Sequence, residues 1–213
     1  MNRKRKLILI ALAVLIVAAG GVFGFLKFRK PEPLICLDAG HGGKDTGAVS
    51  ADGRLEKDDN LNMTLAVGKI LEEKGYRVIY TRTDDSTVTL EERYGLSNKK
   101  HATVFVAIHR NSAENEEVSG VEAWIKNTSP KPDKKLAKNI LRQLTEVGFG
   151  NDRGVHAGYR GDITKNYAVN AHTKCKSCLV ELGFMSNAED NERFDRNFNA
   201  YAEAIAKGII QSL

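Results

Sequence analysis

The stretch LICLDAGHGGKDTGA, residues 34–48, determines how this chain folds. Its first five residues, 34–38, form a short apolar run of the kind that occupies a buried strand. Four glycines then fall within residues 40–48, and they allow backbone conformations that other residues resist. The segment therefore predicts a strand that leads into a tight loop and holds His41 at its end. Sites in α/β sheets lie at such strand ends.

Short apolar runs alternate with helical periodicity along the rest of the chain, which is the pattern of an α/β domain. The predicted strands are residues 34–38, 77–80, 103–108, 120–125 and 177–182, with a weaker candidate at 167–170. The predicted helices are residues 60–74, 90–98, 133–147 and 191–212. We expect one sheet with helices on both faces, in a single domain without repeats.

The N-terminus has the composition of a membrane anchor. Residues 7–26 contain no charged or strongly polar side chain, and a basic cluster at 3–6 precedes them. At about 1.5 Å per residue such a run spans roughly 30 Å, the thickness of a bilayer's hydrocarbon core. The basic cluster favours a cytoplasmic N-terminus, although three more bases within residues 27–30 weaken the asymmetry. We expect one N-terminal transmembrane helix.

The expected organisation is therefore a cytoplasmic basic segment and transmembrane anchor at residues 1–30, a linker at 31–33 and an extracytoplasmic domain at 34–213. The alternative is a cleaved signal peptide, because small residues at 17–19 offer a cleavage position. Either interpretation exports the domain from the cytoplasm.

The charge distribution argues against a nucleic-acid partner. The chain has 32 Lys and Arg against 27 Asp and Glu, a net charge of +5. Residues 1–30 hold seven of these bases and no acid, so residues 31–213 have 25 bases, 27 acids and a net charge of −2. The basic excess belongs to the N-terminus, and we expect no nucleic-acid binding by the domain.

Polar residues that suit a metal site follow the predicted strands. His41 follows the first strand, His109 follows 103–108, and a carboxylate near residue 56 lies on the loop before the helix at 60–74. Two imidazoles and one carboxylate suit zinc, with the fourth position left for water. Glu56 is one candidate carboxylate, and Asp58 and Asp59 are alternatives that the helix dipole would equally favour.

Glu181 is a separate candidate for acid–base chemistry. It lies within CLVELGF, residues 178–184, where an acid is costly to bury without a charge partner. A functional site is the usual reason for such a placement. A carboxylate that does not bind the metal can accept the proton of an attacking water and pass it to a leaving nitrogen.

The chain resembles the zinc-dependent N-acetylmuramoyl-L-alanine amidases of the type-3 group. The similarity covers nearly all of residues 34–213 and rests on six motifs in the family's order and spacing. These motifs are DAGHGGKDTGA (38–48), LEKDDNL (55–61), AIHRN (107–111), GVE (120–122), RGV (153–155) and LVELGFMSN (179–187). A proline that commonly precedes the last of these motifs in the family is missing from TKCKSCLVE, residues 173–181.

The resemblance implies a twisted, mostly parallel six-stranded sheet and one zinc ion. It implies that His41, Glu56 and His109 ligate zinc and that Glu181 is the catalytic acid/base. The implied reaction cuts the amide between N-acetylmuramic acid and L-alanine in peptidoglycan. Predicted substrate contacts, also drawn from the motifs, are Asn111, Arg153 and His156, the last two in a loop beside the cleft.

A short anchored catalytic domain looks most like the sporulation amidases that act in spore cortex, some of which need an activating protein. The competing functions are a catalytically silent wall-binding scaffold and a zinc peptidase that cuts stem peptides. Of the three cysteines, Cys36 is expected in the core, whereas Cys175 and Cys178 form a single CxxC. That pair could be a local disulfide or two reduced thiols.

Overall fold

The structure is a computed structural model that describes residues 32–213. Residues 33–213 form one compact unit. The predicted transmembrane helix at residues 7–26 lies outside the described residues. Within 32–213, none of the helices combines the length and the apolar character needed to cross a bilayer.

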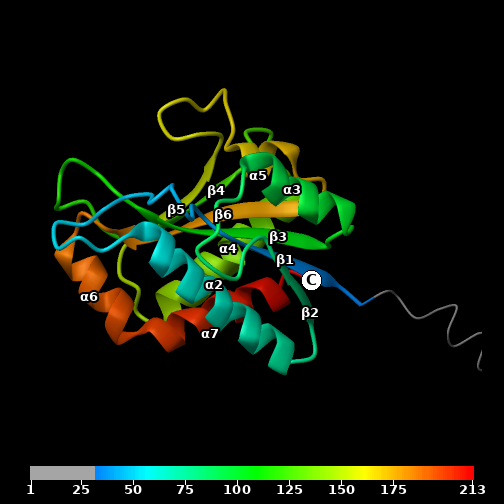
Figure 1. The fold of residues 1–213 in the computed structure, drawn as a ribbon, viewed down its shortest axis with the longest axis horizontal. Coiled ribbons are helices and arrows are strands. Elements are labelled where there is room, and N and C mark those ends of the chain that lie inside the picture. The colour runs from blue at the N-terminus through cyan, green and yellow to red at the C-terminus, as the bar shows by residue number, and fades with distance from the viewer. Residues whose placement is uncertain (1–31) are drawn as a thin grey trace, which may run out of the picture. The chain divides into compact units, whose positions relative to one another are not determined.

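Six strands form one sheet in the order β2-β1-β3-β6-β4-β5 (Figure 1). β1, β2, β3 and β6 run parallel, whereas β4 is antiparallel to β6 and parallel to β5. The sheet is therefore mostly parallel, as predicted, and the carboxyl ends of β1, β3 and β6 meet at one end of it. The strands are β1 (Leu34–Ala39), β2 (Arg77–Tyr80), β3 (Val104–Asn111), β4 (Val121–Ile125), β5 (Asp152–Ala157) and β6 (Lys176–Phe184).

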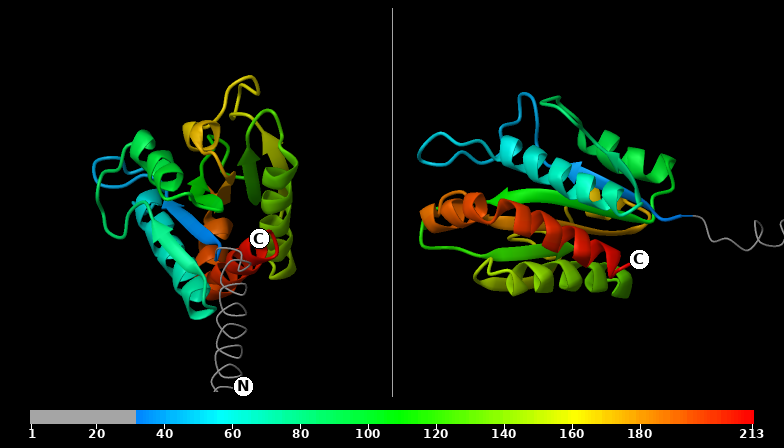
Figure 2. Two further views of the ribbon diagram at one scale, coloured as in Figure 1. Left: turned by 90° about the vertical axis from the view of Figure 1, so that its right-hand side faces the viewer. Right: turned by 90° about the horizontal axis from the view of Figure 1, so that it is seen from below.

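Helices cover both faces of the sheet, as predicted. α2, α4 and α7 pack on one face, and α3 and α5 lie on the other (Figures 1 and 2). α3 begins where the sequence predicts, because Thr89 and Glu92 form a reciprocal capping box. The helices of the described residues are α2 (Glu56–Glu73), α3 (Leu90–Lys99), α4 (Lys131–Glu146), α5 (Ala168–His172), α6 (Ala188–Arg196) and α7 (Phe198–Ile210).

Alternation along the strands divides the core into two unequal parts. Side chains such as Leu37, Val106 and Val180 belong to the larger cluster, which includes the buried residues of α2, α4 and α7. Their strand neighbours belong to a smaller cluster on the α3 and α5 face, because successive side chains point to opposite faces. The buried residues of this smaller cluster are Cys36, Ala102, Phe105, Ala107, Trp124, Val169 and Leu179.

Two predicted elements are wrong. The weak strand at 167–170 is the start of α5, and the sixth strand is β5 instead, which includes the expected loop segment 153–155. β5 lies at the sheet edge and is half exposed, so it lacks the apolar run that marks a buried strand. The single helix predicted at 191–212 is two helices, α6 and α7, which meet at Asn197 with φ −113° and ψ 17°.

All three cysteines are free thiols. Cys178 lies in the larger core cluster, whereas Cys175 packs against the smaller one on the opposite face. Burial raises the pKa of the Cys36 and Cys178 thiols well above their usual range, so both are held as unreactive core groups.

Candidate active site

The candidate site lies on the same face of the sheet as the smaller core cluster, just beyond the last apolar residues of that cluster. Along β3, Ala107 is followed two positions later by His109, and along β6, Leu179 is followed by Glu181. His109 and Glu181 are paired in the register of these two parallel strands. Side chains two residues apart point to the same face of the sheet. The face that carries core residues along most of these strands therefore carries polar site residues at their carboxyl ends.

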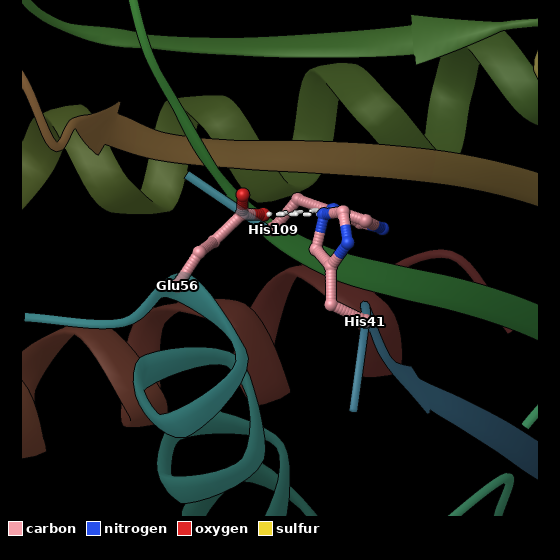
Figure 3. A group of neighbouring side chains, drawn as sticks. All are labelled: His41, Glu56 and His109. Carbon is pink, nitrogen blue, oxygen red and sulfur yellow. Dashed lines mark hydrogen bonds and ion pairs between the residues drawn. The ribbon is translucent and has the colours of Figure 1, made fainter. Parts of the chain in front are cut away.

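Three side chains from three elements converge at this point (Figure 3). His41 comes from the loop after β1, Glu56 from the first turn of α2, and His109 from β3. Glu56 Oε1 lies 3.2 Å from His41 Nε2 and 3.0 Å from His109 Nδ1. Glu56 was expected on a loop, but α2 begins at this residue, four positions before the predicted start.

The donor set fits a tetrahedral zinc ion. Zinc bonds of about 2.0–2.2 Å to nitrogen and oxygen place neighbouring donor atoms about 3.3 Å apart in a tetrahedron. The two donor distances at Glu56, 3.2 and 3.0 Å, are close to that spacing. Neither Asp58 nor Asp59 belongs to the group, and Asp59 is instead bound by Arg54 and Arg110.

Neighbouring groups orient the three side chains. Asp45 Oδ2 lies 2.8 Å from His41 Nδ1, which leaves Nε2 directed at Glu56. Glu56 accepts hydrogen bonds from Asn60 Nδ2 and from the backbone N–H groups of Ala48 and Arg110. Partners of this kind fix ligand orientation at metal sites. Sequence reasoning missed Asp45 and Asn60, although each follows its ligand by four residues.

The charges of these groups shift their protonation. Burial opposes protonation of His41, but hydrogen bonds and charges from Glu56 and Asp45 outweigh it and raise the pKa of His41 to about 9. Burial alone would raise the pKa of Glu56, yet hydrogen bonds from His109 and His41 hold this pKa far below its usual range. Glu56 is therefore an ionised carboxylate, the form that binds a metal.

Glu181 has the opposite environment. Only 7% of the residue is exposed, and its Oε2 atom has no hydrogen-bond partner among the described residues. Burial raises the pKa of Glu181 well above its usual range, and the negative charges of Glu56 and Glu122 add to the shift. A buried carboxyl with a raised pKa and an unpaired oxygen is suited to carry a proton.

Two arginines that sequence reasoning missed hold the loop after β1. Arg82 donates to the carbonyls of Ala39 and Gly40, and Arg93 donates to those of Ala39 and His41. These bonds fix His41 in the left-handed region, with φ 61°, where a non-glycine residue is strained. Arg82 follows the end of β2, a position that could have marked it, whereas nothing in the helical pattern distinguishes Arg93.

The three residues predicted to contact substrate gather around Glu122. Asn111 Nδ2 donates to Glu122 Oε1 at 2.9 Å, and Arg153 Nε donates to Glu122 Oε2 at 2.7 Å. His156 stacks on Trp124 and lies 3.9 Å from Glu122. None of the three lines the cavity above the candidate ligands. Their contact with substrate stays a prediction.

A cavity of about 660 Å³ opens over the three candidate ligands and Glu181. This volume lies within the range of about 300–1,000 Å³ that is usual for ligand pockets. One wall comes from Val88 and Leu90 at the start of α3, and the other from Tyr159 and Tyr167 on the loop between β5 and α5. In Figure 1 this yellow loop projects from the face that carries α3 and α5.

A mostly parallel α/β sheet with two imidazoles, a carboxylate and a buried acid at its strand ends defines a hydrolase with a candidate metal centre. The family model for N-acetylmuramoyl-L-alanine amidase matches residues 35–211. The chain therefore belongs to this family of enzymes, which hydrolyse an amide bond of peptidoglycan.

Individual relatives agree with this assignment. The chain is 34% identical to the uncharacterised Bacillus subtilis protein YqiI over 178 residues, 82% of either chain. It is 30% identical over 179 residues to the amidase LytC of Bacillus subtilis, covering 83% of this chain but only 34% of LytC. The chain thus spans about a third of LytC's length.

Solved structures share the fold. The catalytic domain of the amidase CwlV from Bacillus (Paenibacillus) polymyxa is 33% identical with a TM-score of 0.76, covering 84% of this chain and 97% of that one. The CwlD amidase from Clostridioides difficile, solved in complex with the GerS lipoprotein, is 30% identical with a TM-score of 0.78. That match covers 85% of this chain and 98% of CwlD.

Proposed function

We propose that the chain cuts the amide between the lactoyl group of N-acetylmuramic acid and L-alanine, with one zinc ion held by His41, Glu56 and His109. The observation that carries the proposal is the convergence of these three side chains in one cavity beside the buried Glu181. The donor types and their spacing fit zinc, and Glu181 stays free for proton transfer.

When bound, zinc supplies Lewis-acid polarisation of the scissile carbonyl and lowers the pKa of a water molecule to about 7. Glu181 then takes the proton of the attacking water and gives it to the leaving nitrogen of L-alanine. The C–N bond breaks, and the products are a lactoyl carboxylate and a free amine. In the metal-free chain burial raises the pKa of Glu181, and this environment helps the carboxyl to retain the accepted proton until it passes to the leaving nitrogen.

We also propose that residues 7–26 anchor the enzyme in the membrane and that the domain works on its outer side. Twenty uncharged residues after a basic cluster support this location. We further propose a role in spore cortex, where muramic acid is converted to its lactam, because this short anchored domain resembles the sporulation amidases. Because CwlD was solved with a lipoprotein, we propose that this chain has an activating protein partner.

The deciding experiment measures muropeptide release from peptidoglycan by the purified full chain, with zinc supplied or removed by a chelator. Mass spectrometry should detect intact stem peptides with a free L-alanine amine, and only when zinc is present. Stem peptides shortened at internal bonds would instead identify a zinc peptidase. Absence of any product, even with a candidate lipoprotein partner added, would favour the silent scaffold.

Two variants assign the residue roles. Glu181→Gln keeps the shape of the side chain but cannot shuttle a proton, so kcat should fall by about 100- to 10,000-fold while zinc content is unchanged. Glu117→Gln, the same change in the exposed loop between β3 and β4, is the matched control and should keep full activity. Loss of zinc from the Glu181→Gln protein would contradict the assignment of Glu181 off the metal.

A further inference from the structure

The end of the sheet opposite the candidate site collects basic side chains from several elements. α2 and α3 end there, α4 begins there, and β1, β2 and β6 start there (Figures 1 and 2). We call the exposed bases of this end the basic end. They are Lys74, Arg77, Lys99, Lys100, Lys131, Lys134, Lys135 and Lys174.

Backbone and side-chain contacts join these segments into one surface. Arg77 is the register partner of Leu34, the first residue of β1. At the end of α3, Asn98 accepts a hydrogen bond from the backbone N–H of Lys174 at 2.9 Å. Thr103, just after α3, donates its N–H to the carbonyl of Leu34 at 2.7 Å. The bases of β2, α3 and residue 174 therefore surround the point where the chain enters the domain.

The same surface continues to α4. Lys126 Nζ donates to the carbonyl of Thr173 at 2.7 Å, next to Lys174. α4 packs against β6, and burial together with the charge of Lys135 lowers the pKa of Lys176 at the start of β6. The basic end thus reaches from β2 and α3 through the start of β6 to the first turns of α4.

Few acids oppose these bases. Asp133 is only 3% exposed, Glu72 accepts a hydrogen bond from Tyr80, and Glu73 lies 4.0 Å from Lys69. Glu32 also lies at this end of the domain, and Glu203 of α7 lines a surface pocket together with Lys74. Within residues 32–213, no ion pair involves any of the eight bases. Because residues 31–213 carry a net charge of −2, this end is a local concentration of charge in a nearly neutral domain.

We propose that the basic end is a docking surface for the anionic phospholipid headgroups of the membrane that holds the enzyme. The partner follows from where the chain leaves the domain. Only residues 27–33 separate the proposed span from the domain, and they can extend at most about 25 Å, so this short tether holds the basic end close to the bilayer surface. The inference rests on the proposed membrane anchor and not on the proposed reaction.

Docking of this end directs the catalytic cleft away from the bilayer. β1, β3 and β6 run from the basic end to the candidate site, so the two surfaces lie at opposite ends of the same strands. A tethered domain without this contact would rotate about its linker. Electrostatic contact with lipid instead holds the cleft facing the wall, where its substrate lies.

The first test places the full chain in nanodiscs of phosphatidylcholine alone or mixed with phosphatidylglycerol and measures lysine acetylation by mass spectrometry. Lys131, Lys134, Lys135 and Lys174 should be acetylated more slowly only on the mixed lipid, and added salt should remove the protection. Lys44, on the loop beside the candidate site, should react equally on both lipids. If each of the five lysines is acetylated at the same rate on both lipids, the proposal is overturned.

The second test uses residues 33–213, which have a core of their own and correspond to a region solved alone in CwlV. Lys134→Glu/Lys135→Glu should weaken sedimentation with phosphatidylglycerol vesicles by about 30-fold or more, since each base near an anionic surface strengthens binding about five-fold. The control variant Arg142→Glu/Arg196→Glu makes an equal change in net charge elsewhere on α4 and on α6. It should bind the vesicles as tightly as the unchanged domain does.

Equal loss in both double variants would overturn the proposal by showing a general charge effect. Binding to teichoic acid without binding to vesicles would also overturn it and identify a wall polymer as the partner. Muropeptide release by the same nanodisc samples separates this inference from the proposed function. Protection without activity leaves the docking surface standing, whereas activity without protection removes it.

Discussion

At the scale of single residues, two buried carboxylates in one cavity have contrasting surroundings. Glu56 accepts hydrogen bonds from two backbone N–H groups and from Asn60, and its pKa is held far below the usual range. Glu181 has an oxygen without a partner among the described residues and a raised pKa. Environments that separate the pKa values of two acids also separate their roles, which agrees with the proposed roles of Glu56 as ionised ligand and Glu181 as proton carrier.

The raised pKa of Glu181 predicts a pH-dependent cost to stability. Above the unfolded pKa of about 4.3, the unfolded chain releases the Glu181 proton while the folded chain retains it. This residue's contribution therefore lowers the free energy of unfolding as pH rises towards the folded pKa. In metal-free protein, Glu181→Gln should raise Tm at pH 8 relative to the unchanged chain, and the gain should shrink towards pH 4. Calorimetry across this range measures both Tm values.

A constant Tm difference across that range would mean that the substitution acts through packing and not through ionisation. Glu117→Gln is the control, because the same change on an exposed side chain should leave Tm unaltered at either pH.

A second residue-scale prediction concerns Arg110, whose side chain is fully buried next to the ligand His109. Asp59 binds Arg110 Nη1 at 2.6 Å, and both belong to elements that carry candidate ligands. Asp59→Ala would leave the guanidinium buried without its counter-charge, which should cost about 3–5 kcal/mol in the free energy of unfolding. Asp195→Ala removes an exposed partner of Arg54 and should cost less than about 1 kcal/mol. Urea denaturation compares the two, and equal losses would refute this explanation.

At the scale of elements, the loop after β1 depends on close contact with β3. Gly40 lies against the imidazole of His109, so that a Cβ atom at this position would overlap the ring. The reason is steric and not conformational, because Gly40 does not have a positive φ. The loop can therefore hold His41 beside His109 only if residue 40 has no side chain.

Gly40→Ala should displace His109 and reduce zinc binding while the chain remains folded. We expect a loss of affinity of at least about 10-fold, the effect typical of disturbing the groups that orient a metal ligand. Isothermal titration with zinc, together with circular dichroism, measures this. Gly95→Ala on α3 meets open space and should bind zinc normally, with a gain in stability of about 0.5–1 kcal/mol. Unchanged zinc affinity in Gly40→Ala would contradict the steric argument.

The sequence predicts best those strands that are buried along nearly their whole length. β1, β3 and β6 are buried along nearly their whole length, and each was predicted as an apolar run. β5 is an edge strand whose residues are half exposed, so its pattern resembles a loop. The break between α6 and α7 is also invisible, because Phe194, Phe198 and Tyr201 keep one helical spacing across Asn197.

At the scale of the whole molecule, the candidate ligands tie together three segments that are distant in sequence. His41, Glu56 and His109 come from a loop, a helix and a central strand. A ligand that binds only the folded state stabilises it, by about 4.1 kcal/mol at a thousandfold excess over its Kd. Zinc should therefore raise Tm by about 8–16 °C, since each kcal/mol shifts a domain of this size by about 2–4 °C.

Scanning calorimetry with zinc and with a chelator measures this shift. His109→Ala should show no zinc-dependent rise in Tm. An equal rise in that variant would mean that zinc stabilises the chain from another site.

The sequence predicted the fold class and the residues that meet at the strand ends, because both follow from the periodicity of buried strands. It did not predict the cavity walls, since Tyr159 and Tyr167 come from an irregular loop. Of the basic end, the sequence shows only the run of lysines within residues 131–138, which is typical of a solvated helix face or of a surface that attracts an anionic polymer. A count of charges gives a net of −2 for residues 31–213, and only the strand directions reveal that bases from separate segments lie at one end.

The alternation of side chains along β6 links the register of this strand to both the core and the candidate site. Val180 and Leu182 face the larger core, and Glu181 between them faces the cavity. A slip of β6 by one residue would turn both apolar side chains to the cavity and bury the carboxylate against α4 and α7. The same slip would thus remove the proposed catalytic group and much of the core. A chain misregistered in this way would therefore be unstable as well as inactive, and open to proteolytic removal.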